Sequence, residues 1–254
     1  MIVKELEDYA WFPAVLRQFQ TEFIGSMVAW THIYRPIAPL LDTMLHENNT
    51  RKMVDLCSGS AHPVLYLTQF WKNAVQIHLT DKFPTEPVLP ESAPHQFIVE
   101  RTSYDVLSAS FSKDTIYTMF NAFHHFNDQE QIYIWEQFKK ARAPFLMVEI
   151  LQPNLFEIVK IAITTTIGQL VTAPFIAPFS WRRMFFTYIL PINLLTVTLD
   201  GLISVTKSKT AAGYQQLANL VQTTDYTIET RRIRTRFFTT LTIIQGTPTH
   251  VTNT

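Results

Sequence analysis

The sequence contains little cysteine, little glycine and little charge. Cys57 is the only cysteine among 254 residues, which excludes an internal disulfide and a cysteine-rich metal cluster and fits a reducing compartment. Charged residues make up 17% and hydrophobic residues 47%, which excludes disorder and leaves a partly lipophilic protein open. The 21 basic residues balance the 21 acidic ones, so no overall field would attract a nucleic-acid backbone.

A secretory signal is also missing. The N-terminus reads MIVKELEDYAWF, which is acidic and aromatic and has no basic segment followed by an apolar run. We therefore expect a cytoplasmic protein and leave membrane association open. Four large side chains within residues 1–50 recur at helical spacing: Phe19, Phe23, Met27 and Trp30. This stripe predicts an N-terminal helical cap.

Residues 51–151 show short apolar runs that alternate with polar helical stretches, which is typical of an open, mostly parallel α/β sheet. The predicted strands are Lys52–Cys57, Gln76–Thr80, Gln96–Glu100, Thr115–Phe120 and Phe145–Ile150. A helix capped by Asp128 is expected over Gln129–Arg142. Near the C-terminus, Tyr226–Ile233 and Phe237–Gln245 are β-like and predict an antiparallel hairpin. The core domain should thus comprise 51–151 and 226–247.

Residues 152–225 form a segment too long for an ordinary connection, and we expect an apolar insertion there. Ile161–Ser180 and Met184–Leu199 carry no formal charge, and Trp181, Arg182 and Arg183 separate them. Prolines and polar side chains disfavour a membrane-spanning helix. Two interpretations stay open: a lid over a ligand pocket, or a peripheral membrane contact through 161–199 with tryptophan and arginine at headgroup level. The Asp200–Gly201 pair predicts a turn first, with a substrate contact or a base at Asp200 as the alternatives.

A turn of small residues, VDLCSGSA, ends the first strand. Such a turn lets a ligand approach the backbone closely. A dinucleotide fingerprint would require glycines at positions 57, 59 and 62, where the chain has Cys57, Gly59 and His62. NAD and FAD therefore fit poorly.

In these residues the chain resembles the class I S-adenosylmethionine-dependent methyltransferases, whose first motif is an acidic residue followed by small residues in a G-x-G-x-G rhythm. Asp55, Cys57, Gly59 and Ala61 occupy that rhythm. The resemblance implies a Rossmann-like sheet with S-adenosyl-L-methionine as cofactor. It also implies that Asp55 anchors the loop and the ligand's amino group, while Ser58 and the backbone around Gly59 border the methionine chain.

Two further motifs follow in the order that this family shows. Asp81 ends the second strand, 22 residues after Gly59, where its carboxylate can accept hydrogen bonds from both ribose hydroxyls. Lys82 follows it. The resemblance places a polar pair near the adenine, and Tyr104 and Asp105 occupy that position, with Asp105 able to accept from the exocyclic amine.

The segment after the fourth strand supplies the candidate catalytic residues. Asn121, His124 and His125 lie there, in a segment similar to the His-His segment of small-molecule members of the family. Neighbouring histidines point to different sides, so we expect one of them, with His124 preferred, to face the methyl acceptor as base or orienter. Tyr104 and Glu149 are alternatives. A single carboxylate beside the histidines argues against a metal site.

The sequence thus predicts a methyltransferase that acts on a small, lipophilic acceptor by O- or N-methylation. Nucleic-acid amino-methyltransferases carry a polar-Pro-Pro-aromatic motif after the fourth strand, whereas this chain has Asn121-Ala122-Phe123-His124. Arg231–Arg236 contains four arginines, which more often form a solvated face than a phosphate or lipid contact. The alternative is a catalytically inactive, S-adenosylmethionine-binding, membrane-associated regulatory or assembly protein.

Overall fold

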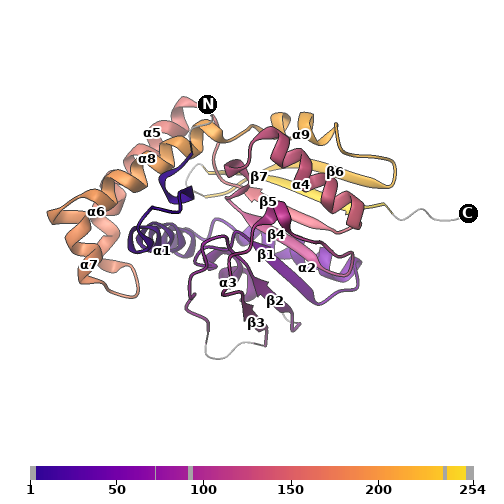
Figure 1. The fold of residues 1–254 in the computed structure, drawn as a ribbon, viewed down its shortest axis with the longest axis horizontal. Coiled ribbons are helices and arrows are strands. Elements are labelled where there is room, and N and C mark those ends of the chain that lie inside the picture. The colour runs from indigo at the N-terminus through magenta and orange to yellow at the C-terminus, as the bar shows by residue number, and fades with distance from the viewer. Residues whose placement is uncertain (1–3, 72, 91–93, 237–238, 250–254) are drawn as a thin grey trace, which may run out of the picture.

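The computed structural model describes residues 4–71, 73–90, 94–236 and 239–249. Its centre is a seven-stranded sheet in the order β3-β2-β1-β4-β5-β7-β6 (Figure 1). The strands are β1 Lys52–Leu56, β2 Gln76–Leu79, β3 Gln96–Val99, β4 Ile116–Phe120, β5 Phe145–Glu149, β6 Tyr226–Arg234 and β7 Thr240–Pro248. β1 to β5 pair in parallel, whereas β7 runs antiparallel to β5 and β6. The predicted mostly parallel, Rossmann-like sheet with its antiparallel C-terminal hairpin is confirmed.

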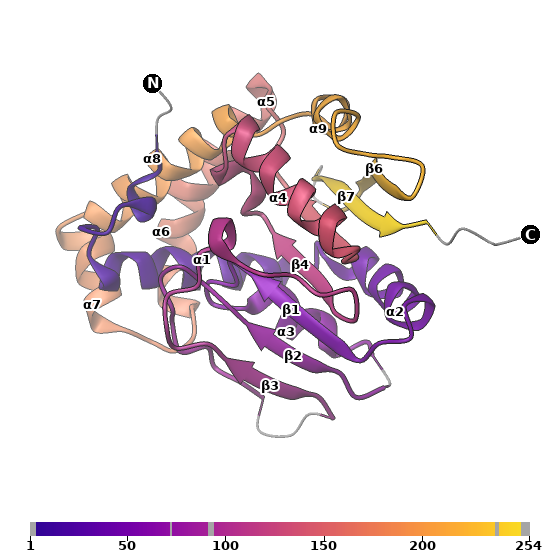
Figure 2. The same cartoon turned by 45° about the vertical axis from the view of Figure 1, so that its right-hand side comes forward.

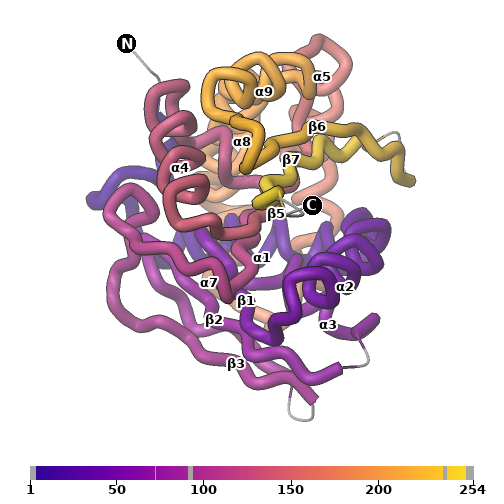
Figure 3. Tube along the Cα trace, turned by 90° about the vertical axis from the view of Figure 1, so that its right-hand side faces the viewer, coloured from indigo at the N-terminus to yellow at the C-terminus, as the bar shows by residue number. Residues whose placement is uncertain are grey.

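Helices cover both faces of this sheet, and each face has its own apolar core (Figure 3). α2 (Ala38–Glu47) and α3 (His62–Thr68) pack on one face, and α4 (Asp128–Ala141) and α9 (Ala211–Ala218) pack on the other. Every residue of β4 and β5 is buried, as expected of central strands that are covered on both sides.

Most predicted strand ends lie within one residue of the observed ones, and two other differences concern α4 and β7. α4 is capped by Asn127 rather than Asp128, because Asn127 and Glu130 each accept the other's backbone N–H in a capping box. The last strand was expected to start at Phe237, which lies outside the described residues, and β7 begins at Thr240.

The N-terminal segment contains a 3-10 turn, Leu6–Asp8, followed by α1, Ala14–Thr31. Phe19 and Phe23 of the predicted stripe are each 2% exposed, whereas Trp30 near the end of α1 is 46% exposed. The helical part of the predicted N-terminal cap is therefore present, with its stripe buried over the first half of α1.

The apolar insertion is a helical hairpin, residues 155–207, which we call the apolar arm. Its elements are α5 Leu155–Ile163, a π turn, α6 Gln169–Thr172, α7 Trp181–Met184, a second π turn and α8 Ile192–Lys207. α8 returns beside α5 (Figure 1). Figure 2 shows that the arm and α1 lie beyond the carboxyl ends of β1, β2 and β3. These ends are the edge at which open parallel sheets bind ligands.

The turn predicted at Asp200–Gly201 is wrong, because both residues lie inside α8. The glycine has a packing role instead. A Cβ atom on Gly201 would lie 2.8 Å from the Cγ2 atom of Ile161, so the missing side chain lets α5 approach α8 closely.

Candidate functional site

A cavity of about 410 Å³ lies at the carboxyl ends of the parallel strands. Loops after β1, β2, β3 and β4 form one wall, and α1, the N-terminal segment and the inner side of the apolar arm form the other. The volume falls within the range of small-molecule pockets, roughly 300–1,000 Å³. The strand order reverses direction between β1 and β4, and this switch point is where such sheets bind their ligands.

The turn after β1 has an unusual backbone that explains its small residues. Cys57, Gly59 and Ala61 have φ angles of 54°, 51° and 58°, so alternate residues lie in the left-handed region. This conformation costs a residue with a side chain about 1–2 kcal/mol. Cys57, Ser58 and Gly59 line the cavity, and the Thr85 hydroxyl donates to the Gly59 carbonyl at 2.6 Å.

Two of the predicted cofactor residues lie outside the cavity wall. Asp55 is 2% exposed, and its carboxylate accepts a hydrogen bond from the Thr118 hydroxyl at 2.6 Å. Burial raises the pKa of Asp55 to about 7. Ala61 is fully buried in the core against the sheet. Asp55 therefore ties the end of β1 to β4, and its carboxylate does not line the cavity in which a ligand's amino group would lie.

The predicted ribose and adenine residues lie together on the cavity wall. Asp81 accepts hydrogen bonds from the backbone N–H groups of Gly59 and Phe83, each at 2.8 Å. Burial raises the pKa of Asp81, although these two N–H groups act in the opposite direction. Lys82 donates to Asp105 at 3.0 Å. Both carboxylates keep unused lone pairs, because each oxygen can accept more than one hydrogen bond.

Tyr104 and Asn121 complete the set of predicted cofactor-binding residues that line the cavity. The Tyr104 N–H donates to the Asp81 carbonyl at 2.9 Å. Burial and then the Glu100 charge raise the pKa of Tyr104, so its hydroxyl stays protonated near neutral pH and is a poor base. Asn121 has a φ of 50°, and its side-chain oxygen accepts from the Ile150 N–H at 3.4 Å.

His124 is held by a buried carboxylate. Its Nδ1 lies 2.6 Å from Glu149 Oε2, and the other Glu149 oxygen accepts the Phe123 N–H at 2.7 Å. The side chains of His124 and Glu149 are 1% and 0% exposed. Because a carboxylate only accepts, Nδ1 is assigned the proton and Nε2 keeps its lone pair. This Nε2 has no hydrogen-bond partner among the described residues, and the nearest carboxylate oxygen recorded for it is Glu5 Oε1 at 3.9 Å. His124 also lines the cavity.

His125 lies in an ion cluster with the N-terminal segment, and Glu5 of this cluster also lies 3.9 Å from His124 Nε2. Its Nδ1 is 2.9 Å from Asp8, and its Nε2 is 3.5 Å from Glu5. Lys207 also contacts Glu5, at 3.0 Å. Burial alone would lower the pKa of His125, but Glu5, Asp8 and Glu7 together raise it to about 10. His125 is therefore a cation near neutral pH and cannot accept a proton there.

Asp200 fixes the N-terminal segment over the cavity. Its carboxylate accepts the backbone N–H groups of Leu6 at 2.6 Å and Glu7 at 3.2 Å, and the Gln20 amide at 3.0 Å. Ser204, one turn further along α8, donates to Glu5 at 2.7 Å. The first residues and the apolar arm thus close one side of the cavity together.

Sequence reasoning missed Glu5, Asp8 and Ser204 and ranked a turn above a substrate contact or a base for Asp200, whereas all four residues line the cavity. Some signals were present. The acidic residues stand out in an otherwise aromatic N-terminal stretch. Asp200, Ser204 and Lys207 recur at positions i, i+4 and i+7, which places polar groups on one side of an apolar helix.

Glu5, His124 and His125 offer one ligand atom each within 4.8 Å of one another, and are thus the described residues that could hold a metal ion. The Lys207 ammonium already contacts Glu5, and Asp8 already contacts His125. These contacts neutralise the group without a metal, so a cation would have to displace them.

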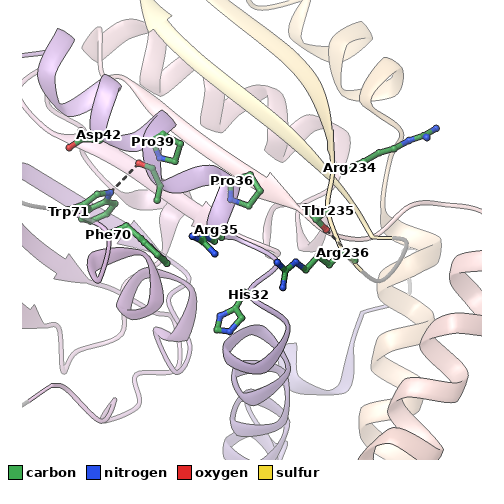
Figure 4. Close-up of a pocket in the computed structure, with 11 residues that line it drawn as sticks. His32, Arg35, Pro36, Pro39, Asp42, Phe70, Trp71, Arg234, Thr235 and Arg236 are labelled. Carbon is green, nitrogen blue, oxygen red and sulfur yellow. Dashed lines mark hydrogen bonds between the residues drawn. The ribbon is translucent and has the colours of Figure 1, made fainter.

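A second hollow, of about 740 Å³, opens beside α2 and α3 at the end of the β6–β7 hairpin. It is lined by Arg35 together with Arg234 and Arg236 of the predicted basic segment. Figure 4 shows Arg236 extending toward Arg35 and His32, whereas Arg234 points away from them. The glycine turn and the histidine pair do not line this hollow, so the candidate active site is the cavity at the strand ends.

No protein-family model matches the chain, and no curated protein matches it. Solved structures do match. The pyocyanin biosynthetic protein PhzM is 12% identical, with 84% of this chain and 54% of PhzM covered and a TM-score of 0.46. Magnesium protoporphyrin IX methyltransferase from Synechocystis PCC 6803, with bound SAH, is 12% identical, with 85% and 83% covered and a TM-score of 0.46.

Human N-acetylserotonin methyltransferase, in complex with SAM, is 11% identical, with 86% of this chain and 54% of that chain covered and a TM-score of 0.47. This chain spans about half the length of the first structures that it matches, which are covered to 50%, 54% and 43%. At these identities the likeness concerns the fold alone, so the function proposed below rests on the residues of the site.

Proposed function

We propose that this chain is an S-adenosyl-L-methionine-dependent methyltransferase that acts on a small, lipophilic acceptor by O- or N-methylation. One observation carries the proposal. The glycine turn, the Asp81 carboxylate and the free Nε2 of His124 all face one cavity at the switch point of the sheet. A cofactor cradle and an oriented histidine thus share one site.

The turn side of the cavity fits the cofactor. The turn has left-handed residues at alternate positions, Cys57, Gly59 and Ala61. This backbone, with only small side chains, leaves room for a ligand to approach the turn closely. Asp81 would hold the ribose hydroxyls, and Tyr104 and Asp105 border the adenine end. When bound, the cofactor supplies a methyl group on a positively charged sulfur.

The opposite side of the cavity suits an acceptor that must lose a proton. Glu149 holds the Nδ1–H of His124 and thereby orients the ring, so Nε2 is the atom that accepts the proton. Phe23, Phe120 and Val197 contribute apolar surface to the wall. This surface favours a lipophilic molecule, because water leaves it when the acceptor binds.

The proposal is tested in two steps. Calorimetry with S-adenosylmethionine measures binding, and turnover of the methyl-labelled donor across lipophilic phenols, carboxylates and amines then measures transfer. We expect both. Binding without transfer to any acceptor would favour the inactive, cofactor-binding alternative, and absence of binding would reject both.

A further inference from the structure

The apolar arm has an inverted distribution of polarity. Every fourth residue along its first half is a large apolar side chain that is 49 to 74% exposed: Leu155, Val159, Ile163, Ile167, Val171 and Phe175. The positions between them that face inward include Glu157, Thr165 and Gln169, which are 1 to 6% exposed. A surface helix in water has the opposite arrangement.

The second half of the arm repeats this inversion. Ile189, Leu195 and Leu199 are 73%, 59% and 51% exposed, whereas Asn193 and Thr196 are 0% and 8% exposed. The segment Leu155–Phe175 is long and apolar enough to cross a membrane, yet only 17% of its most apolar window is buried. A core helix of a soluble protein would be mostly buried.

Several hydroxyl groups on the arm pair with backbone carbonyls of the arm itself. The hydroxyls of Thr165, Thr166 and Thr172 each donate to the carbonyl four residues before them. The Tyr188 hydroxyl donates to the Leu170 carbonyl. Such internal pairing is required where the surroundings offer no hydrogen bonds, as in hydrocarbon.

Arg183 is part of this internal pairing and lies on the inner side of the arm, unlike its neighbour Arg182. Its guanidinium is 1% exposed, pairs with Glu22 at 2.5 Å and donates to the carbonyls of Ile176 and Pro178. These two carbonyls of the loop at the tip of the arm therefore have a hydrogen-bond donor within the protein.

Charge at the tip points to the chemistry of the partner. Within 161–199, all of which the structure describes, Arg182 is the one exposed charged residue. Trp181 beside it is 79% exposed. An exposed tryptophan next to a cation, at the end of an uncharged apolar surface, matches the headgroup layer of a bilayer and its phosphates.

We propose that the outer face of the apolar arm docks into the surface of a lipid bilayer. Docking rather than spanning follows from the packing, because α8 contacts α1 and α5, and the inner side of the arm lines the cavity. The helix pair Trp181–Ile189 and Ile192–Lys207 is also bent by 79°. This proposal does not depend on methyl transfer.

Flotation of the full chain with vesicles tests the proposal. The vesicles contain phosphatidylcholine and phosphatidylglycerol at about 3:1, and no cofactor is added. The variant carries Ile163→Ser, Ile167→Ser and Val171→Ser on the outer face. The control carries Val88→Ser and Leu220→Ser, which are 79% and 70% exposed outside the arm.

We expect the wild type and the control to float, and the arm variant to bind at least about tenfold less, because burial of several side chains is lost. The thermal midpoints of the three proteins should agree, because all five substituted side chains are exposed. Equal flotation of all three proteins, or no flotation of the wild type, overturns the proposal. A dimer that the wild type and the control form in solution and the arm variant does not form would also overturn the proposal, because a second copy of the chain would then cover the outer face. Resistance to alkaline carbonate would indicate a span and overturns docking.

Discussion

Asp200 accepts the backbone N–H of Leu6 at 2.6 Å across a sequence separation of 194 residues. The contact joins α8 to the N-terminal segment, and Ser204 and Lys207 strengthen the same junction through Glu5. The position of the N-terminal segment over the cavity therefore depends on the apolar arm.

We expect Asp200→Ala to destabilise the protein by about 1–3 kcal/mol, because it leaves the part-buried N–H groups of Leu6 and Glu7 without their acceptor. Thermal unfolding measures the loss, and faster hydrogen exchange at Leu6 and Glu7 would locate it. The matched control is Asp114→Ala, an exposed aspartate away from the cavity. Equal stability of both variants would contradict the structural role of Asp200.

Asp81→Ala should weaken S-adenosylmethionine binding at least about tenfold, the effect of one lost charge-assisted hydrogen bond. Calorimetry on the folded variant gives the affinity. Asp81→Asn separates the loss of the negative charge from the loss of the backbone contact, because asparagine removes the charge and keeps one side-chain oxygen that can accept from the backbone. Unchanged affinity in Asp81→Ala would remove the ribose assignment.

His124→Asn should lower turnover by roughly 10²–10⁴-fold, because the proton acceptor is lost while donor binding persists. Glu149→Gln should also lower turnover, because it acts through the orientation of His124 Nε2. The pH profile of turnover should shift in this variant, because the histidine loses its carboxylate partner. His46→Asn, an exposed histidine, is the control. Near-normal turnover of folded His124→Asn would leave proximity alone to explain transfer.

His125 gives a prediction for stability against pH. The folded protein holds its pKa at about 10, compared with 6.5 in the absence of the fold. A raised pKa means that its stabilising effect is complete below pH 6.5 and is lost progressively as the pH rises to about 10. We therefore expect the stability difference between wild type and His125→Asn to shrink from pH 7 to 10 in urea unfolding. A difference that stays constant over this interval would show that the ion cluster is not formed.

Metal removal should leave methyl transfer unchanged. Lys207 and Asp8 already pair with the ligand atoms of Glu5 and His125, so no divalent ion is required to neutralise them. Turnover before and after dialysis against a chelator measures this. A loss that zinc or manganese restores would instead assign Glu5, His124 and His125 as ligands.

The sheet could be predicted from sequence because its signals are local. The unbroken apolar runs of β4 and β5 are typical of doubly covered strands, and the small residues at 57, 59 and 61 follow from their left-handed backbone. The cap of α4 was ambiguous in the sequence, because Asn127 has Glu130 three residues after it and Asp128 has Gln131, and both spacings fit a capping box.

The acceptor side of the site could not be predicted in the same way. His125 meets Asp8 across 117 residues, and Ser204 meets Glu5 across 199, so tertiary packing alone brings them together. Gly201 was misread for a related reason. A glycine signals a turn only when nothing packs against it, and here Ile161 occupies the space of the missing side chain.

One thickness of helix separates the cavity from the outside of the apolar arm. Ile161 and Val197 line the cavity, while Val159 and Leu195, two residues before each of them, are 49% and 59% exposed. An α-helix with its side chains is about 10 Å wide. A molecule dissolved in a bilayer beneath the arm would therefore start within about one helix diameter of the cavity wall. It would pass around α5 or α8 to reach the cavity, without first entering water.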